Sequence, residues 1–84
     1  MDYCFSKDNE VMTVDLHNMK VWDAWNYLDS LIAFAPKGTS EVIVIHGYNN
    51  GTKLMNMIRK DYKNNRVRSK ITSWNLGRTS LILS

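Results

Sequence analysis

Two apolar runs, each followed by a helical pattern, constrain the fold of this chain more than any other feature. The stretch VIVIHGYNNG, at residues 42–51, begins with four β-branched residues, which is typical of a strand buried on both faces, and a strand is predicted over Glu41–Ile45. The segment Glu10–His17 has partly alternating apolar residues and predicts an earlier strand that ends near its histidine. Apolar residues then recur at three- and four-residue spacing, so a helix is predicted after each strand.

The first helix is predicted over Lys20–Ala35, before a proline that disfavours helical geometry in the preceding residue. The second is predicted over Thr52–Lys63, with an inner face formed by Leu54, Met55, Ile58 and Tyr62. Two further strands, Val67–Trp74 and Arg78–Leu83, are predicted around a short turn that contains a glycine.

The resulting order is β-α-β-α-β-β. Helical crossovers join parallel strands and a short turn joins antiparallel ones, so the prediction is an α/β two-layer sandwich with a mixed four-stranded sheet. With 84 residues, a single domain is expected. We predict that it covers residues 11–84 and that residues 1–10 are an N-terminal extension.

Composition limits the location and the kind of site. No apolar run approaches the roughly 20 residues of a membrane span, and the start of the chain lacks the features of a signal peptide, so a cytoplasmic protein without a membrane partner is predicted. The single cysteine cannot form an intrachain disulfide, and no cysteine and histidine cluster has zinc-site spacing, so no metal site is predicted.

Charge is divided unevenly along the chain. Up to Gly51 there are three basic and seven acidic residues, a net charge of −4, whereas the remainder has eight basic residues and one acidic residue, a net charge of +7. A basic half indicates an anionic partner, most commonly nucleic acid. Solvated helix and strand surfaces are an equally good explanation of the same charges.

Both strands that precede helices end in histidine. The carboxyl ends of parallel strands lie at one edge of a sheet, where ligands bind, so we expect Asp15, His17 and His46 to lie close together. Alternation places Asp15 and His17 on one face. Gly47 and Gly51 allow the loop backbone to approach a ligand, and the start of the following helix is suited to phosphate.

These residue types suit cleavage of a phosphodiester bond. A histidine takes a proton from water or a ribose hydroxyl, and lysine or arginine stabilises the charge on phosphorus. Tyr48 is the candidate for stacking on a base, and Arg78 and Thr79 are candidates for phosphate contacts. The alternative is that the histidines have only structural hydrogen bonds.

These motifs together resemble the Smr domain, the small MutS-related domain found at the end of MutS2 proteins and as free-standing proteins. The resemblance is carried, in order, by VDLHN at residues 14–18, Asp23 with Ala24, VIVIHGYNNG, and GRTSLIL at residues 77–83. It implies a fold similar to the C-terminal domain of bacterial translation initiation factor three. It also implies nucleic-acid binding and, in several members, endonuclease activity on DNA or RNA.

The chain departs from the Smr pattern at four positions. Asn18 and Asn49 stand where the family has glycine, Met55 stands where an arginine is common, and Lys20 replaces a threonine that would cap the first helix. Asparagine tolerates left-handed backbone geometry, so the loops are expected to keep their shape. The predicted nucleic-acid contacts are Gly47, Tyr48, Asn49, Gly51, Lys53, Arg59, Arg78 and Thr79.

Three functions remain open from the sequence. The first is an Smr-like endonuclease with Asp15, His17 and His46 as catalytic candidates; the second is a nucleic-acid-binding module without catalysis; the third is a site for a small phosphorylated ligand. Cofactors are unknown, since Asp15 is the one carboxylate expected at the site and a magnesium site has more ligands. A protein partner is compatible with a domain of this size.

Overall fold

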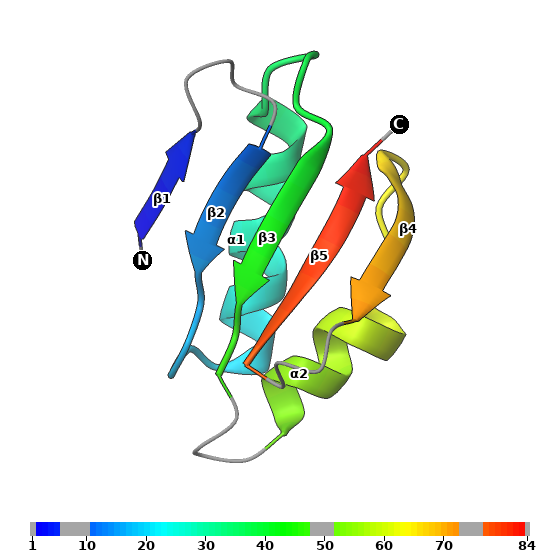
Figure 1. Cartoon of the computed structure of the whole chain (residues 1–84). Coiled ribbons are helices and arrows are strands. Elements are labelled where there is room, and N and C mark those ends of the chain that lie inside the picture. Colours follow the sequence, from blue (N-terminus) through cyan, green and yellow to red (C-terminus); the bar gives the residue numbers. More distant parts are fainter. Residues whose placement is uncertain (1, 6–10, 48–51, 73–76, 84) are drawn as a thin grey trace.

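Five strands form one mixed sheet in the computed structural model, which describes residues 2–5, 11–47, 52–72 and 77–83 (Figure 1). The strands lie in the order β1-β2-β3-β5-β4, and their bounds are β1 Asp2–Phe5, β2 Val11–Asp15, β3 Glu41–Ile45, β4 Val67–Thr72 and β5 Arg78–Leu83. β2 and β3 are parallel, whereas β1 with β2, β3 with β5 and β4 with β5 are antiparallel. The carboxyl ends of β2 and β3 therefore share one edge of the sheet.

The four predicted strands and two predicted helices are all present in the predicted order, and the mixed α/β sandwich is confirmed. The sheet has one more strand than predicted, because β1 forms within residues 1–10, the predicted N-terminal extension. β1 pairs antiparallel with the outer edge of β2. Its four residues are too few to give a clear alternation in the sequence.

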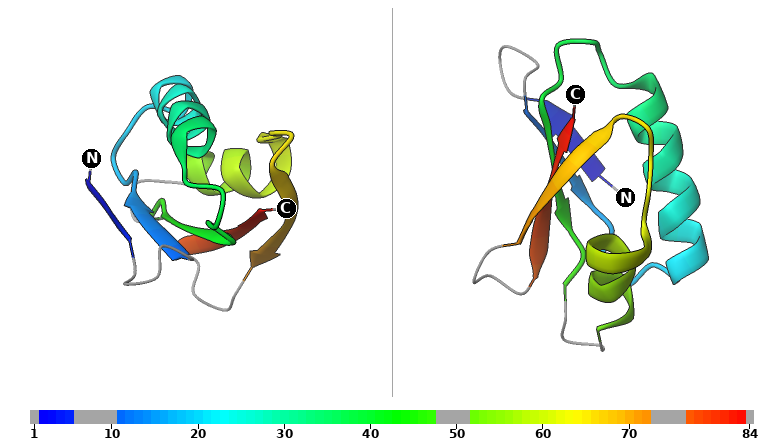
Figure 2. Two further views of the ribbon diagram at one scale, coloured as in Figure 1. Left: turned by 90° about the horizontal axis from the view of Figure 1, so that it is seen from above. Right: turned by 90° about the vertical axis from the view of Figure 1, so that its right-hand side faces the viewer.

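Both helical segments lie on the same face of the sheet, as Figure 2 shows. α1 covers Val21–Phe34, and the next residue, Ala35, is already extended because a proline follows it. α2 covers Lys53–Asn56 and continues directly into η1, a π-helical turn over Met57–Asp61. No helix among the described residues is long and apolar enough to cross a membrane.

The hydrophobic core fills the space between the helices and the inner face of the sheet. Every second residue of the central strands points into it. The helices contribute Ala24, Leu28, Ile32, Leu54, Met57, Ile58 and Tyr62. The predicted inner face of the second helix was wrong at one position, because Met57 is 2% exposed whereas Met55 is only partly buried.

One arginine of the basic half stabilises the end of α1. The Arg66 guanidinium donates hydrogen bonds to the carbonyl oxygens of Ile32 (2.6 Å), Ala35 (3.0 Å) and Pro36 (3.3 Å). The last carbonyls of a helix have no partner within it and carry a partial negative charge, so a cation is favourable there. The charge of Arg66 therefore stabilises the C-terminal end of α1.

Candidate functional site

The edge where β2 and β3 end carries two different sets of side chains. The parallel register continues past β2, since the Leu16 amide donates to the Ile45 carbonyl at 2.7 Å. Alternation then directs Leu16 and His46 toward the helices, where both are buried, and directs Asp15 and His17 to the uncovered face. The prediction that Asp15, His17 and His46 lie close together therefore holds for Asp15 and His17. It is wrong for His46, whose ring points to the helical side.

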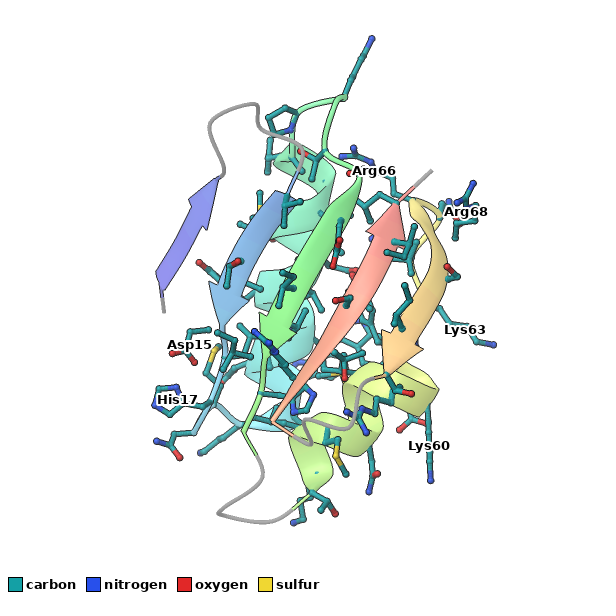
Figure 3. The ribbon with its side chains drawn as sticks, in the orientation of Figure 1. Asp15, His17, Lys60, Lys63, Arg66 and Arg68 are labelled. Carbon is teal, nitrogen blue, oxygen red and sulfur yellow. The ribbon has the colours of Figure 1, made fainter. Side chains whose placement is uncertain are left out.

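Asp15 and His17 form a hydrogen-bonded pair at the end of β2 (Figure 3). The Asp15 Oδ1 atom accepts a hydrogen bond from the His17 backbone amide at 3.0 Å and a second one from the ring nitrogen Nδ1. The His17 side chain is 57% exposed and that of Asp15 is 36% exposed. The pair is therefore accessible to a ligand.

The surroundings of Asp15 favour its carboxylate form. Desolvation by burial raises the pKa of Asp15, but the hydrogen bonds and the charge of His17 outweigh this effect, so the pKa lies below its ordinary value. A carboxylate only accepts hydrogen bonds, so the proton in this contact is on Nδ1 of His17. In the neutral ring the other nitrogen, Nε2, then carries no proton and can accept one.

Two residues beside this pair have left-handed backbone geometry. Gly47 has φ = +71°, and a Cβ atom added there would lie 3.4 Å from Cβ of His17. Asn18 has φ = +67°. Asparagine adopts this region more readily than most residues, so the turn tolerates asparagine where the Smr pattern has glycine.

His46 belongs to a buried chain of hydrogen bonds that joins three elements. Its Nδ1 atom lies 3.0 Å from the Gly47 carbonyl, and its Nε2 atom lies 2.9 Å from Oγ1 of Thr79 in β5. Arg59 of η1 donates from Nε to the same hydroxyl at 2.7 Å. The carbonyl needs a donor, so His46 carries its proton on Nδ1, and the Thr79 hydroxyl donates to Nε2 while accepting from Arg59.

Burial keeps His46 neutral. Desolvation lowers its pKa and the charge of Arg59 adds to this effect, while the Gly47 carbonyl opposes it. The residue is 2% exposed and Thr79 is 1% exposed, so the hydroxyl that we expected to contact phosphate instead binds His46. Both ring nitrogens of His46 are occupied within the protein.

The remaining candidates have different positions. Arg78 is exposed and shares a row with Asp15 on the uncovered face, two strands away through Ile45, which corresponds to about 10 Å. Arg59 also donates to the Arg78 carbonyl at 3.1 Å, and Lys53 is exposed at the start of α2. Tyr48, Asn49 and Gly51 lie outside the described residues. Among those described, no group of three or more His, Cys, Asp or Glu residues could hold a metal ion.

Comparison with known proteins agrees with this geometry. No protein-family model matches the chain, and no curated protein matches it at a significant level. Among solved structures, the crystal structure of the Smr domain of Thermus thermophilus MutS2 is similar, with a TM-score of 0.72 and 26% sequence identity. The similarity covers 86% of this chain and 96% of that one. The chain therefore has an Smr-like fold, and the resemblance predicted from its motifs is confirmed.

Proposed function

We propose that this Smr-like domain binds nucleic acid at the edge formed by the carboxyl ends of β2 and β3, and cleaves a phosphodiester bond there. The observation that carries this proposal is the exposed, hydrogen-bonded pair of Asp15 and His17 at a ligand-binding edge of an Smr-like fold. The family function and the chemistry of the pair agree, since positioned histidines are common general bases.

In the proposed reaction, Nε2 of His17 takes the proton of the attacking water or ribose hydroxyl. Asp15 holds the ring through Nδ1 and stabilises the positive charge that the ring acquires. The bond from phosphorus to the leaving oxygen breaks, and this oxygen takes a proton from a water molecule. The hydroxide left behind takes the proton from Nε2 of His17, which returns the ring to its neutral form. The exposed Arg78, in the same row, offers positive charge to the phosphate.

We assign His46 a positioning role. With both ring nitrogens bound inside the protein, it ties the end of β3 to Thr79 of β5 and, through it, to Arg59 of η1. This fixes Gly47, which lies against His17.

A second candidate function is binding without cleavage. The Asp15 carboxylate is hydrogen-bonded to His17 and its pKa is lowered, so Asp15 has no proton to give to the leaving oxygen. The same arrangement would then hold a phosphate without cutting the strand.

Replacing His17 tests the two functions. The purified protein is incubated with labelled single-stranded RNA, duplex DNA and branched DNA, with and without magnesium, and binding and cleavage are followed separately. We expect His17→Ala to reduce cleavage by about 10²- to 10⁴-fold, the usual contribution of a general base, while binding changes by only a few-fold.

Lys37→Ala, at an exposed lysine beyond the end of α1, serves as the control and should leave both activities unchanged. Cleavage that persists at the original rate in His17→Ala would show that His17 is not the base. Binding by the original protein with no cleavage of any substrate would favour the second function.

A further inference from the structure

A basic groove lies between the end of η1 and β4, at the opposite edge of the sheet from β1. Its volume is about 360 Å³, and Lys60, Lys63, Arg68 and Lys70 line it together with Tyr62. Figure 3 shows Lys60, Lys63 and Arg68 along this side of the molecule, away from Asp15 and His17. None of these four cations is among the predicted site residues.

Lys70 forms the inner part of the groove. It pairs with the buried Leu81 and therefore points to the helical side, where its Nζ atom donates to the Tyr62 carbonyl at 2.6 Å. This carbonyl lies just beyond the end of η1, where the helix dipole favours a cation. Lys70 is thus held in place, and the exposed Lys60, Lys63 and Arg68 lie at the rim.

The charges around the groove are not balanced within the protein. Desolvation lowers the pKa of Lys70 and the nearby Lys63 lowers it further, whereas Asp61 raises it. Asp61 is the one acidic residue after Gly51, and Arg66, the neighbouring arginine, is bound to the end of α1. A second carboxylate, Asp29 of α1, accepts hydrogen bonds from Tyr62 and Asn64 at the groove. Four cations beside two carboxylates still repel one another, and an anion in the groove would reduce that repulsion.

The position of the groove relates it to the candidate site. β2 and β4 are separated by β3 and β5, so three interstrand steps, or about 14 Å, separate Asp15 from the groove across the sheet. Lys70 pairs with Leu81, three residues along β5 from Arg78 in the row of Asp15, which adds about 10 Å along the strands. The groove therefore lies at least about 17 Å from Asp15, on the helical side of the sheet. One strand of a nucleic-acid duplex advances about 3.4 Å per nucleotide, so the two positions are several nucleotides apart. The exposed Arg78 at the start of β5 lies in the row of Asp15 on the uncovered face, two of these three steps across the sheet.

We propose that this groove binds backbone phosphates of the same nucleic-acid strand that lies at Asp15 and His17, several nucleotides away. This inference rests on the proposed function. A row of separate cations along an edge fits a repeating anion, because each can contact a different phosphate. The groove holds the strand in register, and Asp15 and His17 act on it.

Charge reversal in the groove tests this role. Arg68→Glu and Lys63→Glu are compared with Lys37→Glu, which changes the net charge equally but lies beyond α1. The probe is fluorescein-labelled single-stranded RNA of about 20 nucleotides, and affinity is measured over a range of salt concentrations. Log affinity falls as log salt concentration rises, and each phosphate contact on a single strand contributes about 0.7 to the steepness of this fall. We expect each groove variant to reduce the steepness by at least about 0.7, and Lys37→Glu to leave it unchanged.

The possible outcomes separate this inference from the proposed function. If the original protein binds RNA and the groove variants have the same salt slope as Lys37→Glu, the inference fails and the proposed function stands. If the original protein binds neither RNA nor duplex DNA, both fail. If a polyglutamate peptide binds in a way that depends on Arg68 and RNA does not, the groove is a peptide site and the inference is overturned. Thermal unfolding of each variant checks that the exposed substitutions preserve the fold.

Discussion

His17 and His46 follow neighbouring parallel strands but have opposite surroundings. Because side chains alternate along a strand, the offset of one residue in register sends His17 to the uncovered face and His46 to the helical side. Alternation also correctly predicted that Asp15 and His17 share a face. The partners of His46 could not be predicted, because Thr79 lies 33 residues away in the sequence and the bond from Arg59 to Thr79 spans 20.

The buried position of His46 predicts a pH dependence of stability. Its folded-state pKa lies below the ordinary value of 6.5, so the unfolded chain binds the proton more tightly. The stabilisation is fully present above pH 6.5 and decreases as the pH falls from there toward the folded-state pKa, with a slope of up to about 1.4 kcal/mol per pH unit.

The measurement is the free energy of unfolding in denaturant between about pH 7.5 and pH 5, for the original protein and for His46→Gln. Glutamine can accept the Thr79 hydrogen bond without titrating. His17 is present in both proteins, so its contribution cancels in the comparison. An identical pH dependence in the two proteins would contradict a neutral, buried His46.

At the scale of the elements, periodicity predicted most of the fold. β3 and β5 have the predicted bounds, and α1 is one residue shorter at each end. The π-helical turn of η1 was not predictable, because the four-residue spacing of Leu54, Ile58 and Tyr62 fits an uninterrupted α-helix equally well. β1 was missed because a strand of four residues gains its stability from the neighbouring β2.

The start of α1 offers a test of the departure from the Smr pattern. Lys20 occupies the N-cap with the appropriate extended geometry, φ = −70° and ψ = 147°, but its side chain makes no capping hydrogen bond. We expect Lys20→Thr to raise the free energy of unfolding by about 1 kcal/mol, since a threonine oxygen can accept from a free backbone amide. The measurement is the denaturant midpoint at unchanged m-value.

Lys20→Ala removes the same charge at the same position without supplying a hydroxyl, so it separates capping from the effect of charge. Its stability should change by less than about 0.5 kcal/mol. Equal stability of the two variants would mean that the N-cap of α1 gains nothing from a hydroxyl.

At the scale of the whole molecule, the charge asymmetry indicated an anionic partner but not where the charges lie. In the structure, Arg66 donates hydrogen bonds to carbonyl oxygens at the end of α1, and Arg59 donates one to the hydroxyl that also binds His46. Four other cations line the groove. Sequence could not separate these uses, since each depends on which carbonyl or hydroxyl the fold brings within reach. The explanation of the charges as solvated surface is therefore wrong for Arg66 and Arg59, whose guanidinium groups have protein partners.

The separation of groove and candidate site predicts the lengths of cleavage products. A strand held at both positions is cut several nucleotides from the groove, so products of only about one or two nucleotides should be scarce from one of its two ends. A strand labelled at either end and resolved on a denaturing gel shows this directly. In Arg68→Glu, which weakens the hold of the groove on the strand, shorter products should become more abundant. If the original protein released single nucleotides equally from both ends of the strand, this prediction would be contradicted.

The pairing of β1 has a practical consequence for all these experiments. Asp2 is the register partner of Asp15, so the chain enters the sheet directly beside the candidate site. β5 ends at the other end of the sheet, where the Leu83 amide bonds to the Ser40 carbonyl ahead of β3 (Figure 1). An affinity tag or fusion partner placed before β1 would crowd the edge where substrate is expected, whereas one placed after β5 would leave that edge open.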